Sequence, residues 1–455
     1  MKAKKAKLPR RARSLADSIR QFLTPEVWKQ AHQARHAAQP SRSSRWQCEP
    51  LLMVLLLFTW CCGDSCAERF EAARAFYVVC HPRRRRPGKT VPGFQKALAK
   101  LPLRVLRRVA EGVRRRLAQL LAERLSVDGW IPFGVDGSRL ECPRTEELEQ
   151  RLGCVGKKGS APTLWVTALV HLRLGVLWSW RLGKGRASER EHARQLLSTL
   201  PAGALLVADA GFNGYGLAQT ILAHKLSFLI RMSAKVTLLC DQAPLRGQRD
   251  ALVWYWPEQQ REAGGQPLRV RLLRLRGQKK KQDVWLLTNV LDRQRLPLAV
   301  ASQFYRWRWE NEGLFRTYKR TLKKVKLLSR TVRLVHREAE GSLLATQLLL
   351  AQGGLAVRPR RQVKGQTTTD LCSPRQVLLE IRREMNALTG PRRRRAFSIR
   401  LEEARRERRP RQSGKEKRQW PRPHQNHKPP RPPKMRELND LEKRTMHRLK
   451  CLQVA

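Results

Sequence analysis

The chain has 455 residues, which is long enough for two or three domains. Lysine and arginine total 94 against 37 acidic residues, which gives a formal net charge of +57. Such an excess is self-repulsive unless a polyanion is near, so nucleic acid is the leading partner, with a membrane surface or the ribosome as alternatives. Hydrophobic residues make up 41% of the chain, enough to build a core.

Cysteine spacing and apolar runs exclude further classes of protein. The ten cysteines form no Cys-x-x-Cys pair, so we expect reduced cytosolic thiols and no zinc finger. The basic N-terminus does not have the pattern of a signal peptide. Residues 51–62 are strongly apolar but too few to span a bilayer, so they indicate a buried helix and no membrane contact.

Residues 1–125 are predicted to form a helical, basic region. Pro25 opens one helix, because proline suits the first turn. An apolar and then an amphipathic helix follow at 51–77, and a long amphipathic helical region covers 94–125. Two interpretations stay open, a helical bundle with solvated arginines or recognition of DNA through its phosphates. A helix-turn-helix pattern does not stand out.

From residue 126 the pattern alternates between strands and helices, which predicts an α/β sheet. One strand ends in Asp136 and another in Asp209, each followed by glycine or small residues. Carboxylates at the ends of adjacent strands favour a metal site, although a single Asp-Gly pair is usually only a turn. The predicted strands are 131–135, 163–172, 175–182, 204–208 and 228–231, and the helices are 189–200 and 217–224.

Residues 235–292, approximately, hold β-like runs rich in valine and leucine, with turn residues between them. We expect a mainly antiparallel β subdomain that leaves and re-enters the sheet. The runs are 235–239, 251–256, 268–276 and 283–290.

Residues 304–326, FYRWRWENEGLFRTYKRTLKKVK, predict one helix that is basic and aromatic. Its acids, Glu310 and Glu312, could pair with neighbouring arginines in a structural helix. Alternatively, an acid could hold a metal ion while the bases around it hold phosphates. Four residues with the spacing Y-x2-R-x3-E-x6-K would share one helix face. They are Tyr305, Arg308, Glu312 and Lys319.

This spacing resembles the signature of DDE transposases of the insertion-sequence-4 type. VDGSRL at 135–140 and VADAGFNGYG at 207–216 resemble the first and second aspartate motifs of that family. The resemblance implies an α/β ribonuclease-H-like catalytic core with an inserted, mainly antiparallel β subdomain. It also implies that Asp136, Asp209 and Glu312 are catalytic and bind two Mg²⁺ or Mn²⁺ ions.

The resemblance further implies cut-and-paste DNA transposition by cleavage and strand transfer at the terminal inverted repeats of a mobile element. The partners would be double-stranded DNA, as transposon ends and target, and a second copy in a homodimer, in the bacterial cytoplasm at the nucleoid. Tyr305, Arg308 and Lys319 would bind phosphates. Trp285 would stack on a flipped base, unless it is a core aromatic of a strand. The alternatives are a catalytically inactive, domesticated nucleic-acid-binding protein and a metal-dependent nuclease without strand transfer.

The C-terminal region continues helically before it becomes polybasic. A helix at 338–352 should pack on the sheet, and another is expected at 374–388. From Pro391 the composition favours disorder or a loose helix that acts as a basic arm. The predicted regions are a helical, basic DNA-binding region at 1–125, a catalytic domain at 126–355 with its insertion at about 235–292, and a basic helical or disordered region at 356–455.

Overall fold

The computed structural model describes residues 14–35, 44–156, 159–242, 248–277, 283–357, 369–387, 396–404 and 432–454. The chain forms two compact units. The helical unit comprises Met1–Leu125, Gly137–Ala187 and Glu310–Arg408, and the sheet unit comprises Ser126–Asp136, Ser188–Trp309 and Arg409–Ala455. The first boundary falls where the sequence changes character, but each unit joins segments that the sequence assigned to different regions.

In the helical unit, α4 and α5 pack against an apolar helix, α3, whereas α1 and α2 pack against α6. Almost every side chain of α3 is buried, which confirms the buried helix predicted at this run. The predicted helical region 94–125 is formed by three helices, and Pro102, which lacks an N–H, stands at the start of α6. No helix in the described part of the chain is long and apolar enough to cross a bilayer. These helices are α1 (Leu15–Phe22), α2 (Pro25–Gln33), α3 (Cys48–Trp60), α4 (Cys66–Cys80), α5 (Val91–Lys100), α6 (Leu103–Leu120) and α7 (Ala122–Leu125).

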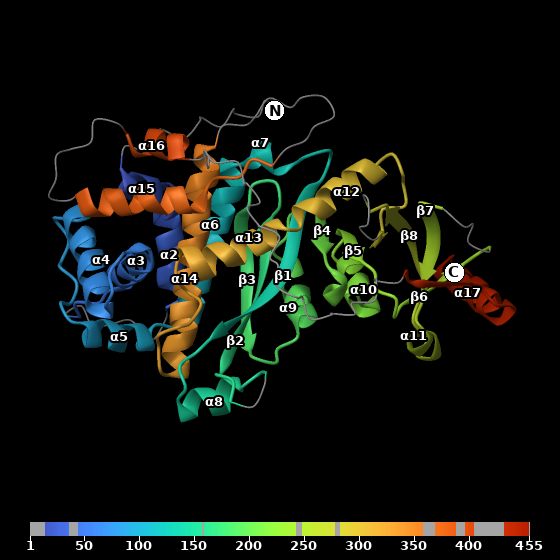
Figure 1. Ribbon diagram of the computed structural model, residues 1–455, viewed down its shortest axis with the longest axis horizontal. Helices are drawn as coiled ribbons and strands as arrows, with labels where there is room; N and C mark the ends of the chain where they lie inside the picture. The colour runs from blue at the N-terminus through green and yellow to red at the C-terminus, as the bar shows by residue number, and fades with distance from the viewer. Residues whose placement is uncertain are drawn as a thin grey trace, which may run out of the picture. The chain divides into compact units, whose positions relative to one another are not determined.

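Helix α14 (Val332–Ala356) is the central element of the helical unit and packs against α3, α6 and β3 (Figure 1). Gly341 permits the approach to α3, since a Cβ there would lie 2.4 Å from Cδ2 of Leu55. Gln347 Nε2 donates to the carbonyl of Trp178 on β3 at 3.2 Å, as expected for a helix that packs on strands. The other elements of this unit are α8 (Glu146–Leu152), the antiparallel pair β2 (Thr163–His171) and β3 (Val176–Lys184), α13 (Glu310–Arg316), α15 (Pro374–Asn386) and α16 (Phe397–Ala404).

The sheet unit contains mixed strands in the order β10-β6-β7-β8-β9-β5-β4-β1. β1, β4 and β5 are parallel, whereas the pairs from β5 through β9, β8 and β7 to β6 are antiparallel. The strands expected in the β insertion are therefore present as β6 to β9. They form a continuation of the same sheet, because β9 pairs with β5. The strands are β1 (Ile131–Glu141), which continues into the helical unit, β4 (Ala204–Ala208), β5 (Ser227–Arg231), β6 (Thr237–Cys240), β7 (Asp250–Tyr255), β8 (Leu268–Leu275), β9 (Val284–Thr288) and β10 (Lys434–Glu437). The α-helices are α9 (Glu189–Leu197), α10 (Tyr215–Ala223), α11 (Glu258–Glu262), α12 (Leu298–Trp307) and α17 (Asp440–Val454).

The described parts of the C-terminal tail contain the helices α16 and α17, in keeping with a helical region, and also a strand, β10, that the composition did not predict. Phe397 and Leu401 of α16 are buried, and β10 adds a parallel strand to the edge of β6. Composition alone missed this, because a strand can form in a basic segment when an open sheet edge supplies its backbone hydrogen bonds. Residues 388–395 and 405–431, where the basic arm was also expected, lie outside the described residues.

A buried arginine ties the β insertion to the chain that leads into α12. The Arg271 side chain is 0% exposed and makes a bidentate pair with Asp250 at 2.8 and 2.9 Å. It also donates to three main-chain carbonyls at 2.9 to 3.3 Å. These carbonyls belong to Val290, Asp292 and Leu296.

We expect Arg271→Ala to lower the free energy of unfolding by about 3–5 kcal/mol, because it leaves a carboxylate and three carbonyls without their donor. Urea denaturation measures this loss. Arg293→Ala is the matched control, since Arg293 lies 3.7 Å from the same Asp250 carboxylate with its side chain 64% exposed. It should cost about 0–1 kcal/mol. Equal losses for the two variants would contradict the assignment.

Candidate active site

The strand register places the two predicted catalytic aspartates side by side. β1 and β4 pair in parallel from Ile131↔Ala204 to Gly134↔Val207. The same register continued by two residues sets Asp136 opposite Asp209. Neighbouring strands lie about 4.8 Å apart, and residues in register on parallel strands point to the same face. Both aspartates are half-buried. Asp209 directly follows β4, whereas Asp136 lies within β1, which continues to Glu141, so the predicted end of that strand at Asp136 is wrong.

Asp209 is held by the turn that follows it, and two residues missed by the sequence reading lie beside it. Its Oδ1 accepts a hydrogen bond from Gly211 N at 2.9 Å and caps a short 3-10 helix, Ala210–Phe212. A Cβ on Gly211 would lie 3.1 Å from this oxygen and 3.8 Å from Oε2 of Glu189, so the two carboxylates flank the glycine. Arg190 Nε donates to the Gly211 carbonyl at 2.9 Å. The position of Glu189 and Arg190 at the start of α9 gave no sequence signal.

The loop after Asp209 is attached to the β insertion. The Tyr255 hydroxyl of β7 donates to Asn213 Oδ1 at 3.3 Å, and its ring meets that of Tyr215 edge-on at 5.8 Å. The Tyr215 hydroxyl donates to the carbonyl of Gln266. Burial raises the pKa of Tyr255 to about 12, so its hydroxyl stays a proton donor at neutral pH. The insertion thus supports the loop that carries the second aspartate.

The signature stretch is not the single helix that its periodicity predicts. α12 ends at Trp307, and α13 begins at Glu310 after a two-residue turn. A π-helical segment follows at Thr317–Thr321, in which Thr317 Oγ1 donates back to the Gly313 carbonyl at 2.9 Å. Such back-bonding bends helices, and a π turn shifts later residues around the axis. Helical structure ends before Lys323, which has φ +55°.

The four signature residues therefore do not share one continuous helix face. Tyr305 lies on α12 and Arg308 in the turn, both in the sheet unit, whereas Glu312 lies exposed on α13 and Lys319 on the π-helical segment of the helical unit. Tyr305 and Arg308 are each 8% exposed, with the guanidinium 5.5 Å from the tyrosine ring centroid. The prediction that these four residues share one face of a single helix is therefore wrong.

Trp285 and Lys319, both predicted to bind DNA, are half-buried. Trp285 is half-buried on β9 and pairs across the strands with Arg274, whose guanidinium lies 5.3 Å from its ring centroid. This placement suits a strand aromatic, and the base-stacking role stays a prediction. Lys319 is half-buried, and burial lowers the pKa of its ammonium group.

Lys324 also lies in the stretch 304–326, whose basic side chains were expected to hold phosphates. It is instead buried in an ion pair with an acid. Its Nζ lies 2.9 Å from Oε1 of Glu338 on α14. Glu338 Oε2 accepts from the backbone N–H groups of Leu328 and Ser329, both at 2.9 Å. Burial acts to raise the pKa of Glu338, but Lys324 and these N–H groups outweigh it, and the pKa is lowered.

The donor types of the predicted triad suit a hard cation, because Mg²⁺ and Mn²⁺ prefer carboxylate oxygen. The register brings two of these carboxylates together in the sheet unit. Glu312 belongs to the helical unit. Across the residues described, no group of three or more His, Cys, Asp or Glu side chains is arranged to hold a metal ion. The three-residue metal site therefore stays a prediction.

Residues 133–348 match the family model of the transposase DDE domain. The matched span begins within β1, ends within α14, and contains Asp136, Asp209 and Glu312. This match shows that residues 133–348 are similar to the transposase DDE domain, which supports a DDE transposase.

Comparison with whole proteins adds little. No curated protein matches the chain. Among solved structures, the chain is similar to a piggyBac transposase synaptic complex with hairpin DNA, determined by cryo-EM. The TM-score is 0.43 at 11% sequence identity, over 89% of this chain and 88% of the other. A likeness this weak supports no conclusion about the site.

We expect the Glu338 interactions to make stability depend on pH in the acid range. The folded pKa lies below the ordinary 4.5, so this contribution is fully present above that value and is lost as pH falls through the folded pKa. Glu338→Gln should flatten the fall of the urea midpoint between about pH 6 and pH 3.

Glu149→Gln is the control for this measurement, because Glu149 makes only an exposed pair with Arg144 at 3.5 Å. It should leave the wild-type pH dependence in place. A Glu338→Gln profile identical to that of the wild type would show that this carboxylate is not the titrating group.

Proposed function

We propose that this protein is a metal-dependent DNA transposase of the insertion-sequence-4 type. The observation that carries the proposal is the parallel register of β1 and β4, which brings Asp136 and Asp209 together within the matched transposase DDE domain. The exposed Glu312 on α13, in the family signature, supplies the third carboxylate.

In this proposal Asp136, Asp209 and Glu312 hold two Mg²⁺ or Mn²⁺ ions. Such ions activate a water or a 3′-hydroxyl and stabilise the leaving oxygen of the phosphodiester. The protein itself supplies no nucleophile. Its own contribution is orientation, because Gly211 N fixes one oxygen of Asp209 and Tyr255 fixes the following loop. The reaction is cleavage at the terminal inverted repeats and strand transfer into a target, by cut-and-paste transposition.

The residues proposed to hold the DNA end are Tyr305, Arg308, Lys319 and Trp285. Arg308 is suited to a phosphate, since its Nε is buried without a hydrogen-bond partner among the described residues. Lys319 supplies a point charge, and desolvation strengthens its attraction to an anion. Tyr305 would donate one hydrogen bond through its hydroxyl. Trp285 would stack on a flipped base, a contact worth about 1–3 kcal/mol.

The proposed partners are double-stranded DNA, as transposon ends and target, and a second copy of the chain on that DNA. We place the protein at the bacterial nucleoid. A catalytically inactive, domesticated DNA-binding protein is the second candidate, and a nuclease without strand transfer is the third. The paired Asp136 and Asp209 favour an enzyme, because two acids facing DNA only weaken simple binding.

We expect Asp136→Ala, Asp209→Ala and Glu312→Ala each to reduce cleavage of a terminal-repeat duplex in Mg²⁺ to background, because each removes a metal ligand. DNA binding measured in EDTA should be nearly unchanged. Glu310→Gln is the matched control, two residues from Glu312 on the same helix, and should cleave normally. Normal cutting by Asp209→Ala would overturn the assignment. Cleavage products without joined target DNA would favour the nuclease.

Lys319→Ala is expected to reduce the slope of log binding constant against log salt by about 0.9, the value for one phosphate contact. The measurement is a salt titration of binding to end DNA. Lys319→Arg keeps the charge and should keep the slope. Arg308→Ala should lower the slope equally, but it also removes packing against Tyr305, so Lys319 is the cleaner probe. An unchanged slope for Lys319→Ala would remove this residue from the clamp.

A further inference from the structure

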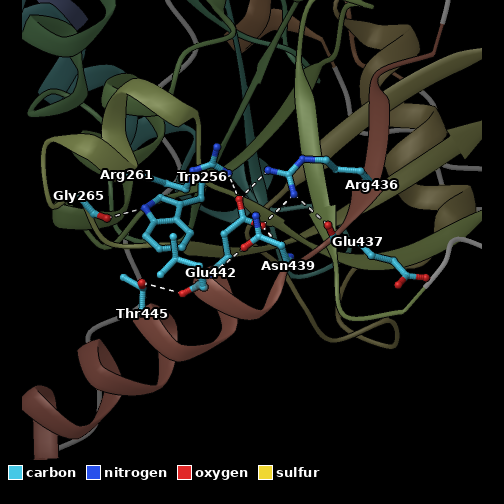
Figure 2. Close-up of polar contacts among 9 residues, drawn as sticks. Trp256, Arg261, Gly265, Arg436, Glu437, Asn439, Glu442 and Thr445 are labelled. Atoms are coloured by element: carbon cyan, nitrogen blue, oxygen red, sulfur yellow. Dashed lines mark hydrogen bonds and ion pairs between the residues drawn. The ribbon is translucent and has the colours of Figure 1, made fainter.

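The C-terminal helix α17 is anchored to the sheet unit through one buried glutamate, Glu442 (Figure 2). The Glu442 side chain is 7% exposed and accepts from Arg436 at 2.6 and 2.8 Å. Arg261 of α11 forms a second ion pair with it. Asn439 completes the anchor, since its N–H donates to Oε2 at 2.9 Å and its side-chain oxygen accepts from Glu442 N at 2.8 Å. This reciprocal pair caps the start of α17.

The anchor turns Glu442 of α17 inward. The exposed positions of the helix carry the cations Arg444 and Arg448, together with Asp440, whose carboxylate lies 3.8 Å from Lys443. Glu442 and Met446, one turn apart, are buried and define the inner face. Arg444 and Arg448 lie on the opposite side, and both are exposed. The carboxylate of Glu442 is matched by two arginines, so it does not offset the outer charge. Like charges four residues apart repel each other along a helix, and a bound anion relieves that repulsion.

We propose that the outer face of α17, defined by Arg444 and Arg448, binds backbone phosphates of duplex DNA. This inference rests on the proposed function, which makes DNA the polyanion, but it assigns a contact outside the stretch 304–326 and the two aspartate motifs. A straight helix that presents arginines one turn apart can follow a phosphate backbone. A lipid surface fits less well, because among the side chains of α17 that the structure describes, Met446 is buried and Leu441 alone offers a large exposed apolar surface.

The test is a salt titration of duplex binding by the full chain in EDTA, with Arg444→Ala/Arg448→Ala against wild type. We expect the slope of log binding constant against log salt to fall by about 1.8, corresponding to two phosphates. Circular dichroism and thermal unfolding should match wild type, because both side chains are exposed. Arg444→Lys/Arg448→Lys should retain the slope.

Arg151→Ala is the matched control, because Arg151 is exposed at the end of α8 among Glu146, Glu147 and Glu149. It should leave the slope unchanged. An unchanged slope for the double alanine variant, with wild type still binding DNA, would overturn this inference alone. Failure of wild type to bind DNA would overturn the proposed function as well. Loss of binding to phosphatidylserine vesicles with unchanged DNA binding would assign the face to a membrane and overturn the proposal.

Discussion

The parallel register of β1 and β4 is the constraint on which the rest of the candidate site depends. This parallel pair has little freedom to slip, because a one-residue shift would move every side chain of the shifted strand to the opposite face of the sheet, against different neighbours. The register that buries Phe133 and Leu206 therefore also sets Asp136 opposite Asp209. The hydrogen bonds of Gly211 and Tyr255 then hold the loop after Asp209 against the insertion.

Within each unit, buried ion pairs connect segments that are separate in the sequence. Arg271 links the insertion to the chain before α12, Lys324 and Glu338 hold the segment after the signature to α14, and Glu442 holds α17. Burying one partner alone would be costly, so each pair forms as a unit. In a chain of net charge +57, acids that face inward leave the outward surface more positive. The stability of the interior and the attraction to a polyanion thus both depend on where the few carboxylates lie.

The stretch 304–326 has a geometry that its periodicity does not predict. Periodicity at 304–326 predicts one helix. However, Gly313 and the back-bonding Thr317 favour a bend, and the helix is interrupted by a turn at Arg308 and Trp309. The spacing of Tyr305, Arg308, Glu312 and Lys319 marks a family without implying a shared face. Arg308 is buried between the rings of Tyr305 and Trp309, which sequence spacing does not reveal.

The sequence by itself determined the strand before Asp209, the antiparallel runs of the insertion and the buried helix α3, because alternation and apolar runs are local signals. It located the start of β1 but not its length, since β1 continues past Asp136 to Glu141. The pairing of the two aspartates required the tertiary structure, since register depends on which strands become neighbours. The same holds for Glu189 beside Gly211, for Glu338 beneath Lys324, and for β10 on the edge of β6. Each of these contacts joins residues far apart in the chain or without any local pattern, and only packing of the folded chain brings them together.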